Sequence, residues 1–339
     1  MKNNEFTPNE LSKETKASMK VRIISAIVGI IIAVPIIVLG DFFLFGAVAI
    51  ILLISTYEII HCAKRKYCIA LYIVAFILAL LMTYWPLLVS LPDFISGSRS
   101  FDVWHVYTAF DRIYVSVSVL ALGAFSVFFM VIIDKGFTVR DACFIFTMML
   151  IITIGYQSAL FIRYLPSQIY HMQPGASENY FNWYDSFESC LLLVYVLLAT
   201  FMTDAGAYFV GVFFGKHKMN PRISPKKTWE GFAGGIVISS LVSFGFAMLM
   251  CGLGHPLVIG LLDMKHWYLI SILSLIIPPV SVLGDFVFSS AKRHFDIKDF
   301  GNIIPGHGGM LDRLDSVIFT SIFTAVFISM IQYWSQFIK

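Results

Sequence analysis

Charge is scarce in this sequence: Asp, Glu, Lys and Arg make up 13% of the 339 residues, whereas hydrophobic residues make up 58%. So little polar surface cannot cover a soluble globular protein, and the mean hydropathy of +0.81 agrees. The five cysteines are scattered and show no C-x-x-C spacing, so neither a zinc site nor a disulfide framework is predicted. No basic face alternates with stacking aromatic residues, which argues against a nucleic-acid partner.

The sequence is rich in long apolar segments. A helix needs about 20 mostly apolar residues to cross the roughly 30 Å hydrocarbon core of a bilayer, and such runs recur along the whole chain. We therefore predict an all-α polytopic integral membrane protein with about nine transmembrane helices. The expected spans are Ile23–Leu39, Phe42–Ile60, Ile69–Leu91, Ile113–Ile133, Ala142–Tyr164, Phe187–Thr203, Gly231–Cys251, Tyr268–Phe288 and Val317–Ile338.

The basic residues predict the orientation, because cytoplasmic loops retain Lys and Arg. With the N-terminus inside, 19 of the 24 Lys and Arg residues fall on the inner side, and the opposite orientation would invert that ratio. We therefore expect the N-terminus inside and the C-terminus outside. Residues 1–22 would form a cytoplasmic polar tail, 23–200 the N-terminal transmembrane helices, and 201–339 a transmembrane region with two cytoplasmic charged loops.

The stretch Ser289–Asp315 concentrates polarity, with eight charged side chains and two histidines. Just before it, Asp285 lies inside an apolar run, where an aspartate costs about 2.5–3.5 kcal/mol unless it is paired or faces a polar cavity. Asp285, Ser289 and Lys292 follow at i, i+4 and i+7, so they would line one face of a continuing helix. An internal Asp–Lys ion pair is the alternative interpretation.

Residues 302–309, NIIPGHGG, cannot form a regular helix. Pro305 and the three glycines favour tight turns in which backbone N–H groups can approach an anion. Asp312 and Asp315 then open the last span at i and i+3, close enough to share a cation, and their hard oxygens favour Mg²⁺ over zinc. The alternative is that these acidic residues complement the N-terminus of the last helix.

A second charged segment is expected to begin as a loop at Thr203. It contains Asp204–Tyr208 and, further on, Ser224–Gly231 with the sequence SPKKTWEG. Both charged segments fall on the same predicted membrane face, which favours one shared site for a highly charged ligand. The alternative is a positive-inside anchor followed by a helix cap at Thr228.

These residues resemble the signature of the phosphatidate cytidylyltransferases, also called CDP-diglyceride synthetases. The resemblance is dense from about residue 200 to 316. It is carried by Asp204–Tyr208, Ser224–Gly231, and the run Ser289-x-x-Lys292-Arg293-x4-Lys298-Asp299-x-Gly301-x3-Pro305-x-His307-Gly308-Gly309-x-x-Asp312-Arg313-x-Asp315. Two positions depart from the pattern. Ala291 replaces a larger aliphatic residue, and Phe288 stands where an acidic residue is expected, which removes one candidate ligand.

The resemblance implies an enzyme that transfers CMP from CTP to phosphatidate, giving CDP-diacylglycerol and pyrophosphate in phospholipid biosynthesis, with residues 201–339 as the catalytic region. The two substrates bring about six negative charges together, and phosphatidate is already an anionic nucleophile near pH 7. Catalysis would then depend on alignment and charge neutralisation, without a general base. The alternatives are a CTP-dependent lipid-alcohol kinase, which would have to activate a hydroxyl, and an ion-coupled membrane transporter, since intramembrane Asp and Pro-broken spans also mark ion pathways.

The same resemblance implies roles for individual residues. The catalytic residues would be Asp285, Ser289, Lys292, Arg293, Lys298, Asp299, His307, Asp312, Arg313 and Asp315. The substrate-binding residues would be Asp204, Tyr208, Ser224, Lys226, Lys227, Thr228, Gly308 and Gly309.

Asp285 and Asp312, with Asp315 in support, are expected to bind Mg²⁺, and a second cation is an open question. The basic side chains would neutralise phosphates, the arginines through bidentate contacts. His307 would either orient pyrophosphate or make a hydrogen bond within its turn. The expected partners are CTP, phosphatidate and membrane lipids, for a multi-pass protein of the cell membrane with its active site on the cytoplasmic face. A homodimer is left open.

Overall fold

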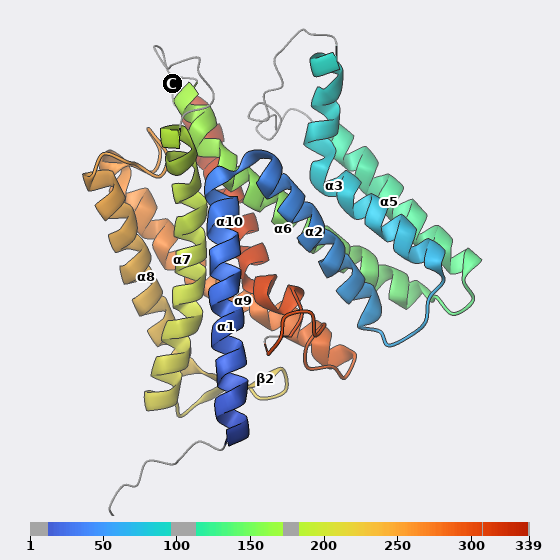
Figure 1. Ribbon diagram of the computed structural model, residues 1–339. Helices are drawn as coiled ribbons and strands as arrows, with labels where there is room; N and C mark the ends of the chain where they lie inside the picture. Colours follow the sequence, from blue (N-terminus) through green and yellow to red (C-terminus); the bar gives the residue numbers. More distant parts are fainter. Residues whose placement is uncertain (1–12, 96–112, 172–182, 307, 338–339) are drawn as a thin grey trace, which may run out of the picture.

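The computed structural model describes residues 13–95, 113–171, 183–306 and 308–337, which form a bundle of long helices (Figure 1). The helices are α1 (Lys13–Leu39), α2 (Asp41–His61), α3 (Ile69–Ile95), α5 (Ile113–Ile133), α6 (Val139–His171), α7 (Trp183–Phe214), α8 (Trp229–Gly252), α9 (Trp267–His294) and α10 (Leu311–Phe337). The short elements are the strands β1 (Lys218–Asn220) and β2 (Ser224–Thr228) and the 3₁₀ turn η2 (Met264–His266).

The chain is a helical polytopic membrane protein. Within the described ranges, 7 helices are long and apolar enough to cross a membrane. The first and fourth expected spans contain the shorter apolar stretches Ile27–Leu39 and Ser118–Ile133. In Figure 1, α1 begins at the lower end of the bundle, and α10 ends at the upper end.

The expectation that a charged loop begins at Thr203 is wrong, because α7 continues to Phe214 and carries Asp204–Tyr208 on a helix. The charged connection that follows is a short antiparallel hairpin, with Lys218 opposite Thr228 and Asn220 opposite Ser224. Among the described residues, the two strands of this hairpin are the only named strands, and the all-α prediction did not include them.

Small residues allow α7 to continue, because they bring it close to α8. The buried residues of α8 are Gly231, Gly235, Ser239, Ser243 and Ala247, one every four positions. A Cβ atom on Gly235 would lie 2.8 Å from the carbonyl oxygen of Thr203 in α7. Small residues at such contacts are typical of helices that pack within lipid. This packing fixes both ends of the β1–β2 hairpin.

A second close crossing joins α9 to α10. A Cβ atom on Gly284 would lie 3.0 Å from the carbonyl oxygen of Asp315 and 2.9 Å from the Cβ atom of Phe319. The helix α9 runs without interruption through Pro278 and Pro279. The polar end of α9 therefore lies directly beside the first turn of α10.

Candidate active site

The polar face predicted for α9 is present. The hydroxyl of Ser289 donates a hydrogen bond of 3.2 Å to Oδ1 of Asp285, one turn earlier. Lys292 follows on the same helix and is buried, with 7% of its surface exposed. The predicted alternative, an ion pair between Asp285 and Lys292, is wrong, because each residue pairs with a different segment of the chain.

Asp285 pairs with Lys227 of β2, and this ion pair joins the two charged segments of the sequence. Both side chains are partly exposed, at 24% each, but the ammonium nitrogen of Lys227 is itself buried. The ammonium group of Lys227 also lies 4.9 Å from the ring centroid of Phe286, a geometry in which an aromatic ring stabilises a cation. The hairpin and α9 therefore form two walls of one site.

Lys292 pairs with Asp312 in the first turn of α10, with 2.7 Å between Nζ and Oδ1. The other oxygen of Asp312 accepts hydrogen bonds from the backbone N–H of Phe300, at 2.7 Å, and of Gly309, at 3.0 Å. Gly308, between them, has a φ angle of +90°, which favours glycine. Asp312 therefore holds together the loop between α9 and α10.

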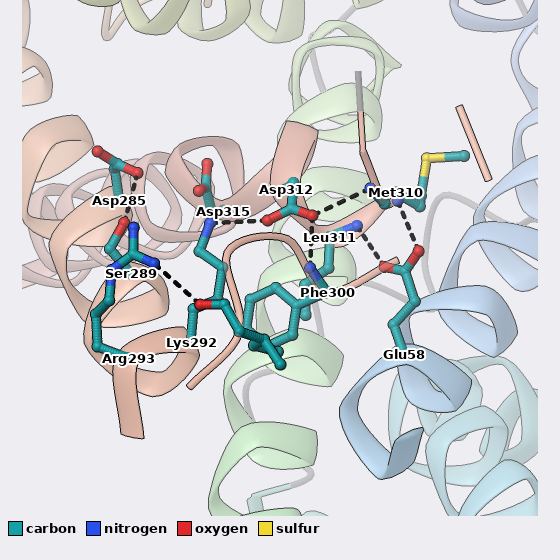
Figure 2. Close-up of polar contacts among 12 residues, drawn as sticks. Glu58, Asp285, Ser289, Lys292, Arg293, Phe300, Met310, Leu311, Asp312 and Asp315 are labelled. Atoms are coloured by element: carbon teal, nitrogen blue, oxygen red, sulfur yellow. Dashed lines mark hydrogen bonds and ion pairs between the residues drawn. The ribbon is translucent and has the colours of Figure 1, made fainter. Parts of the chain in front are cut away.

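A carboxylate from outside the predicted catalytic region also binds this loop. Glu58 on α2 accepts hydrogen bonds from the backbone N–H of Met310 and Leu311, at 2.9 and 2.8 Å. Figure 2 shows Glu58 and Asp312 on opposite sides of the chain as it enters α10. Glu58 thus satisfies backbone N–H groups where α10 begins, which complements the helix dipole. The alternative interpretation gave this role to Asp312 and Asp315, whose backbone donors are instead Phe300, Gly309 and Ser316.

Asp315 and Asp204 complete the acidic part of the site. Asp315 is 7% exposed, and its Oδ1 accepts a hydrogen bond of 2.7 Å from the N–H of Ser316. Its carboxylate interacts electrostatically with Asp285, Lys292 and Asp204. The Asp204 carboxylate in turn interacts with Lys227 and Arg313. Helices α7, α9 and α10 and the strand β2 therefore each contribute charge to one place.

Other predicted residues have more local contacts. The Arg293 side chain donates to the backbone carbonyls of Ile223 and Ile297, at 3.3 and 3.0 Å. Thr228 is the N-cap of α8 and accepts a hydrogen bond of 3.1 Å from the N–H of Gly231. This cap was predicted by the alternative interpretation of the segment, a positive-inside anchor followed by a helix cap. Ser224 is half-buried in the hairpin and Gly309 is buried beside Asp312.

Several of the predicted residues are exposed. They are Asp204, Tyr208, Lys226, Arg293, Lys298, Asp299 and Arg313. His307 lies outside the described residues.

The two departures from the family pattern are both accommodated by packing. Phe288 is completely buried, with its ring 6.1 Å from those of Phe300 and Phe319. Ala291 packs against the same apolar core. Position 288 therefore faces the interior of the bundle here and contributes no ligand to the polar face of α9.

The donor chemistry of the site suits Mg²⁺, which prefers carboxylate oxygens and is usually held by one or two carboxylates together with substrate phosphates. Within the described ranges, no three carboxylate, imidazole or thiolate groups lie together as a complete metal cage. Asp312 already accepts three hydrogen bonds, whereas Asp285 is paired with a lysine that is partly exposed. A cation held here would therefore need further oxygen ligands from a bound molecule.

Sequence reasoning missed two carboxylates that organise this region. Glu58 is an acidic residue within an expected span, Phe42–Ile60, so the rule that singled out Asp285 also applied to it. Glu230 accepts from the backbone N–H of Lys216 and His217, at 3.1 Å each, and closes the base of the hairpin. For Glu230 no signal was available, because its partners lie across a loop whose shape the sequence does not define.

Comparison with known proteins agrees with this geometry. The model of a family described as the cytidylyltransferase family matches residues 20–331. A phosphatidate cytidylyltransferase of Bacillus subtilis is 45% identical over 127 residues, which cover 38% of this chain and 43% of that protein. A protein of the same name from Staphylococcus aureus is 29% identical over 303 residues, which cover 89% of this chain and 95% of that protein. A third, from Staphylococcus epidermidis, is 42% identical over 132 residues, 39% of this chain and 46% of that one.

Proposed function

Because this chain belongs to the cytidylyltransferase family, we propose that it transfers the CMP group of CTP to phosphatidate, giving CDP-diacylglycerol and pyrophosphate. The observation that carries the proposal is the ion pair between Lys227 and Asp285. It brings together two charged segments that the whole of α8 separates in the sequence. A site built from basic and acidic groups at one end of a membrane bundle suits a polyphosphate and a lipid phosphate.

The reaction is a substitution at phosphorus. An oxygen of the phosphatidate phosphate attacks the α-phosphorus of CTP and forms a new P–O bond. The bond from that phosphorus to the oxygen bridging the α- and β-phosphates breaks, and its electron pair leaves with pyrophosphate. Because the attacking oxygen is already ionised near neutral pH, the protein has to align the two phosphates and neutralise their charge.

Lys227 is the residue best placed to exchange partners during binding. Its ammonium nitrogen is buried beside Asp285, so the ammonium group has to leave that carboxylate to bind an incoming phosphate oxygen. Asp285 then loses its counter-ion and becomes available to a cation. The exposed Arg313 and Lys226 would add charge at the rim, where an arginine can bind two phosphate oxygens at once.

Lys292 has a different role in this proposal, because it is buried against Asp312. It keeps its partner and adds a fixed positive charge behind the phosphates. Asp285 and Asp315 would hold Mg²⁺, with Asp312 organising the loop beside them. When bound, Mg²⁺ would supply further neutralisation of phosphate charge.

The location follows from the same proposal. CTP is a cytoplasmic nucleotide, so the hairpin and the loop between α9 and α10 would face the cytoplasm of a cell whose membrane holds the protein. That orientation places the N-terminus inside, and with nine spans it places the C-terminus outside.

A direct assay tests the proposal. Protein purified in detergent is incubated with Mg²⁺, CTP labelled in the cytosine ring, and phosphatidate. We expect labelled CDP-diacylglycerol and one pyrophosphate for each lipid formed. A lipid-alcohol kinase would instead need a lipid alcohol as its substrate and would convert labelled CTP to labelled CDP. A transporter would consume no CTP.

A further inference from the structure

Glu58 combines features that no other carboxylate of the N-terminal helices shows among the described residues. It lies on α2, is 1% exposed, and gives one oxygen to the N–H of Met310 and the other to the N–H of Leu311. Burying a carboxylate is costly unless its oxygens are satisfied. Both oxygens are satisfied by a segment more than two hundred residues away in the sequence, which makes the contact specific to this loop.

Two glycines of the charged segment leave room for this carboxylate. A Cβ atom on Gly301 would lie 2.5 Å from Oε1 of Glu58, and the next two atoms that it would meet also belong to Glu58. A Cβ atom on Gly309 would lie 2.5 Å from the same oxygen. Neither glycine has a positive φ angle, so the backbone conformation does not require glycine there. The space occupied by Glu58 is the physical reason for Gly301, whereas a Cβ atom on Gly309 would also lie 2.7 Å from the backbone nitrogen of Gly301.

From these contacts we infer that Glu58 is a positioning residue for the proposed reaction, and the inference rests on that proposed function. Its carboxylate fixes the N–H groups of Met310 and Leu311, next to Gly309. Gly309 donates to Asp312, and Asp312 holds Lys292. Glu58 therefore acts on the charged site through the backbone of the loop, with no direct contact to a reacting group.

The first test is kinetic. In Glu58→Gln the side chain keeps its shape, but an amide NH₂ group replaces one oxygen and faces a backbone donor. We expect kcat to fall at least about tenfold, the scale of one hydrogen bond to a charged group. The KM for CTP should change less than about threefold, since no contact to the nucleotide is removed. Glu188→Gln is the matched control, because Glu188 pairs with His255 away from the site, at 3.0 Å, and we expect its kcat to stay at the wild-type level.

A double-mutant cycle separates this contact from a general effect on folding. Gly301→Ala should displace the Glu58 carboxylate and reduce kcat about as much as Glu58→Gln does. Glu58→Ala removes the atoms that the new methyl group would meet. Adding Gly301→Ala to Glu58→Ala should therefore change kcat by less than about threefold. If the two losses multiplied instead, the two residues would act independently and the inference would be wrong.

Amide hydrogen exchange gives a readout that does not depend on activity. In Glu58→Gln and Gly301→Ala, peptides covering residues 300–312 should exchange faster than in the wild type, while Glu188→Gln should leave them unchanged. Unchanged exchange in Glu58→Gln would overturn the inference, and so would faster exchange with a normal kcat. If wild-type protein made no CDP-diacylglycerol, the proposed function would fail, whereas the exchange result would still decide whether Glu58 holds the loop.

Discussion

At the scale of the residue, the aspartates of the site differ in what their oxygens contact. Asp285 pairs with a partly exposed lysine, so Asp285→Asn should leave the fold intact. It should reduce turnover at least about tenfold, because a neutral amide is a poorer ligand for Mg²⁺ than a carboxylate. The variant should also need more Mg²⁺ to reach its own maximum rate. The measurements are CDP-diacylglycerol formation across an Mg²⁺ titration and thermal unfolding in detergent.

Asp312→Asn should behave differently, because the carboxylate of Asp312 accepts from Lys292, Phe300 and Gly309. An amide cannot satisfy all three donors, and an unsatisfied buried donor costs about 1–3 kcal/mol. We expect loss of turnover together with a lower unfolding temperature. Asp296→Asn is the control for both variants, since Asp296 is exposed and its φ of +51° suits asparagine. Equal stability of Asp285→Asn and Asp312→Asn would contradict this division of roles.

The two neighbouring lysines of β2 offer a matched comparison. Lys227 pairs with Asp285, whereas Lys226 is exposed on the strand. Lys227→Gln should reduce kcat/KM at least about tenfold, because a charge-assisted hydrogen bond contributes about 1.5–3 kcal/mol. Lys226→Gln should have a smaller effect, seen mainly in the KM for substrate. A larger loss of kcat/KM in Lys226→Gln than in Lys227→Gln would mean that Lys227 only pairs with Asp285 and does not bind substrate.

At the scale of the element, the contact between α7 and α8 sets the position of the hairpin. Gly235→Ala would place a methyl group 2.8 Å from a backbone oxygen of α7, which cannot move without shifting the helix. Overpacking of this kind typically costs about 1–3 kcal/mol, so we expect a lower unfolding temperature and lower activity. Gly245→Ala, in the same helix, meets no atom within 4 Å and should match or exceed wild-type stability. Equal unfolding temperatures for the two variants would argue against this contact.

Most helices could be predicted from the sequence, because hydropathy and span length depend on local residues alone. The expected span Ile113–Ile133 coincides with α5, and Phe42–Ile60 is within one residue of α2 at each end. The end of α7 could not be predicted in this way. Asp204 and Gly206 interrupt the apolar run, and the reason that the helix continues is its packing against the glycines of α8. The hairpin was missed because three and five residues give too short a pattern.

The sequence predicted which residues belong to the site, but it did not predict which of them pair with one another. Intramembrane position singled out Asp285, and helical spacing placed Ser289 beside it. The partner of Lys292 could not be predicted, because helical spacing suggests Asp285, and only the crossing of α9 and α10 selects Asp312. The contact of Glu58 with the loop depends on how α2 packs, and no local pattern contains that information.

At the scale of the whole molecule, the N-terminal helices take part in the charged end of the bundle. Lys64, after α2, donates to the carbonyl oxygen of Asp296, at 3.3 Å. The Nη2 atom of Arg140, at the start of α6, lies 2.8 Å from the Nε2 atom of His294. Together with Glu58, these contacts hold the end of α9 and the loop that follows from two sides. The region 201–339 therefore depends on helices that lie outside it.

An active site made of two segments requires both to face the same compartment, and this gives a test of topology. Single cysteines are introduced by Asn220→Cys in the hairpin, Asn302→Cys in the loop before α10, and Lys265→Cys in η2, in a protein without the five native cysteines. The side chains of Asn302 and Lys265 are exposed, and that of Asn220 is half-buried. With the proposed orientation, a membrane-impermeant thiol reagent should label position 265 in intact cells. Positions 220 and 302 should react only after the cells are permeabilised. Labelling of 220 but not 302 from outside would place the two segments on opposite faces, and no common site for CTP and phosphatidate could then exist.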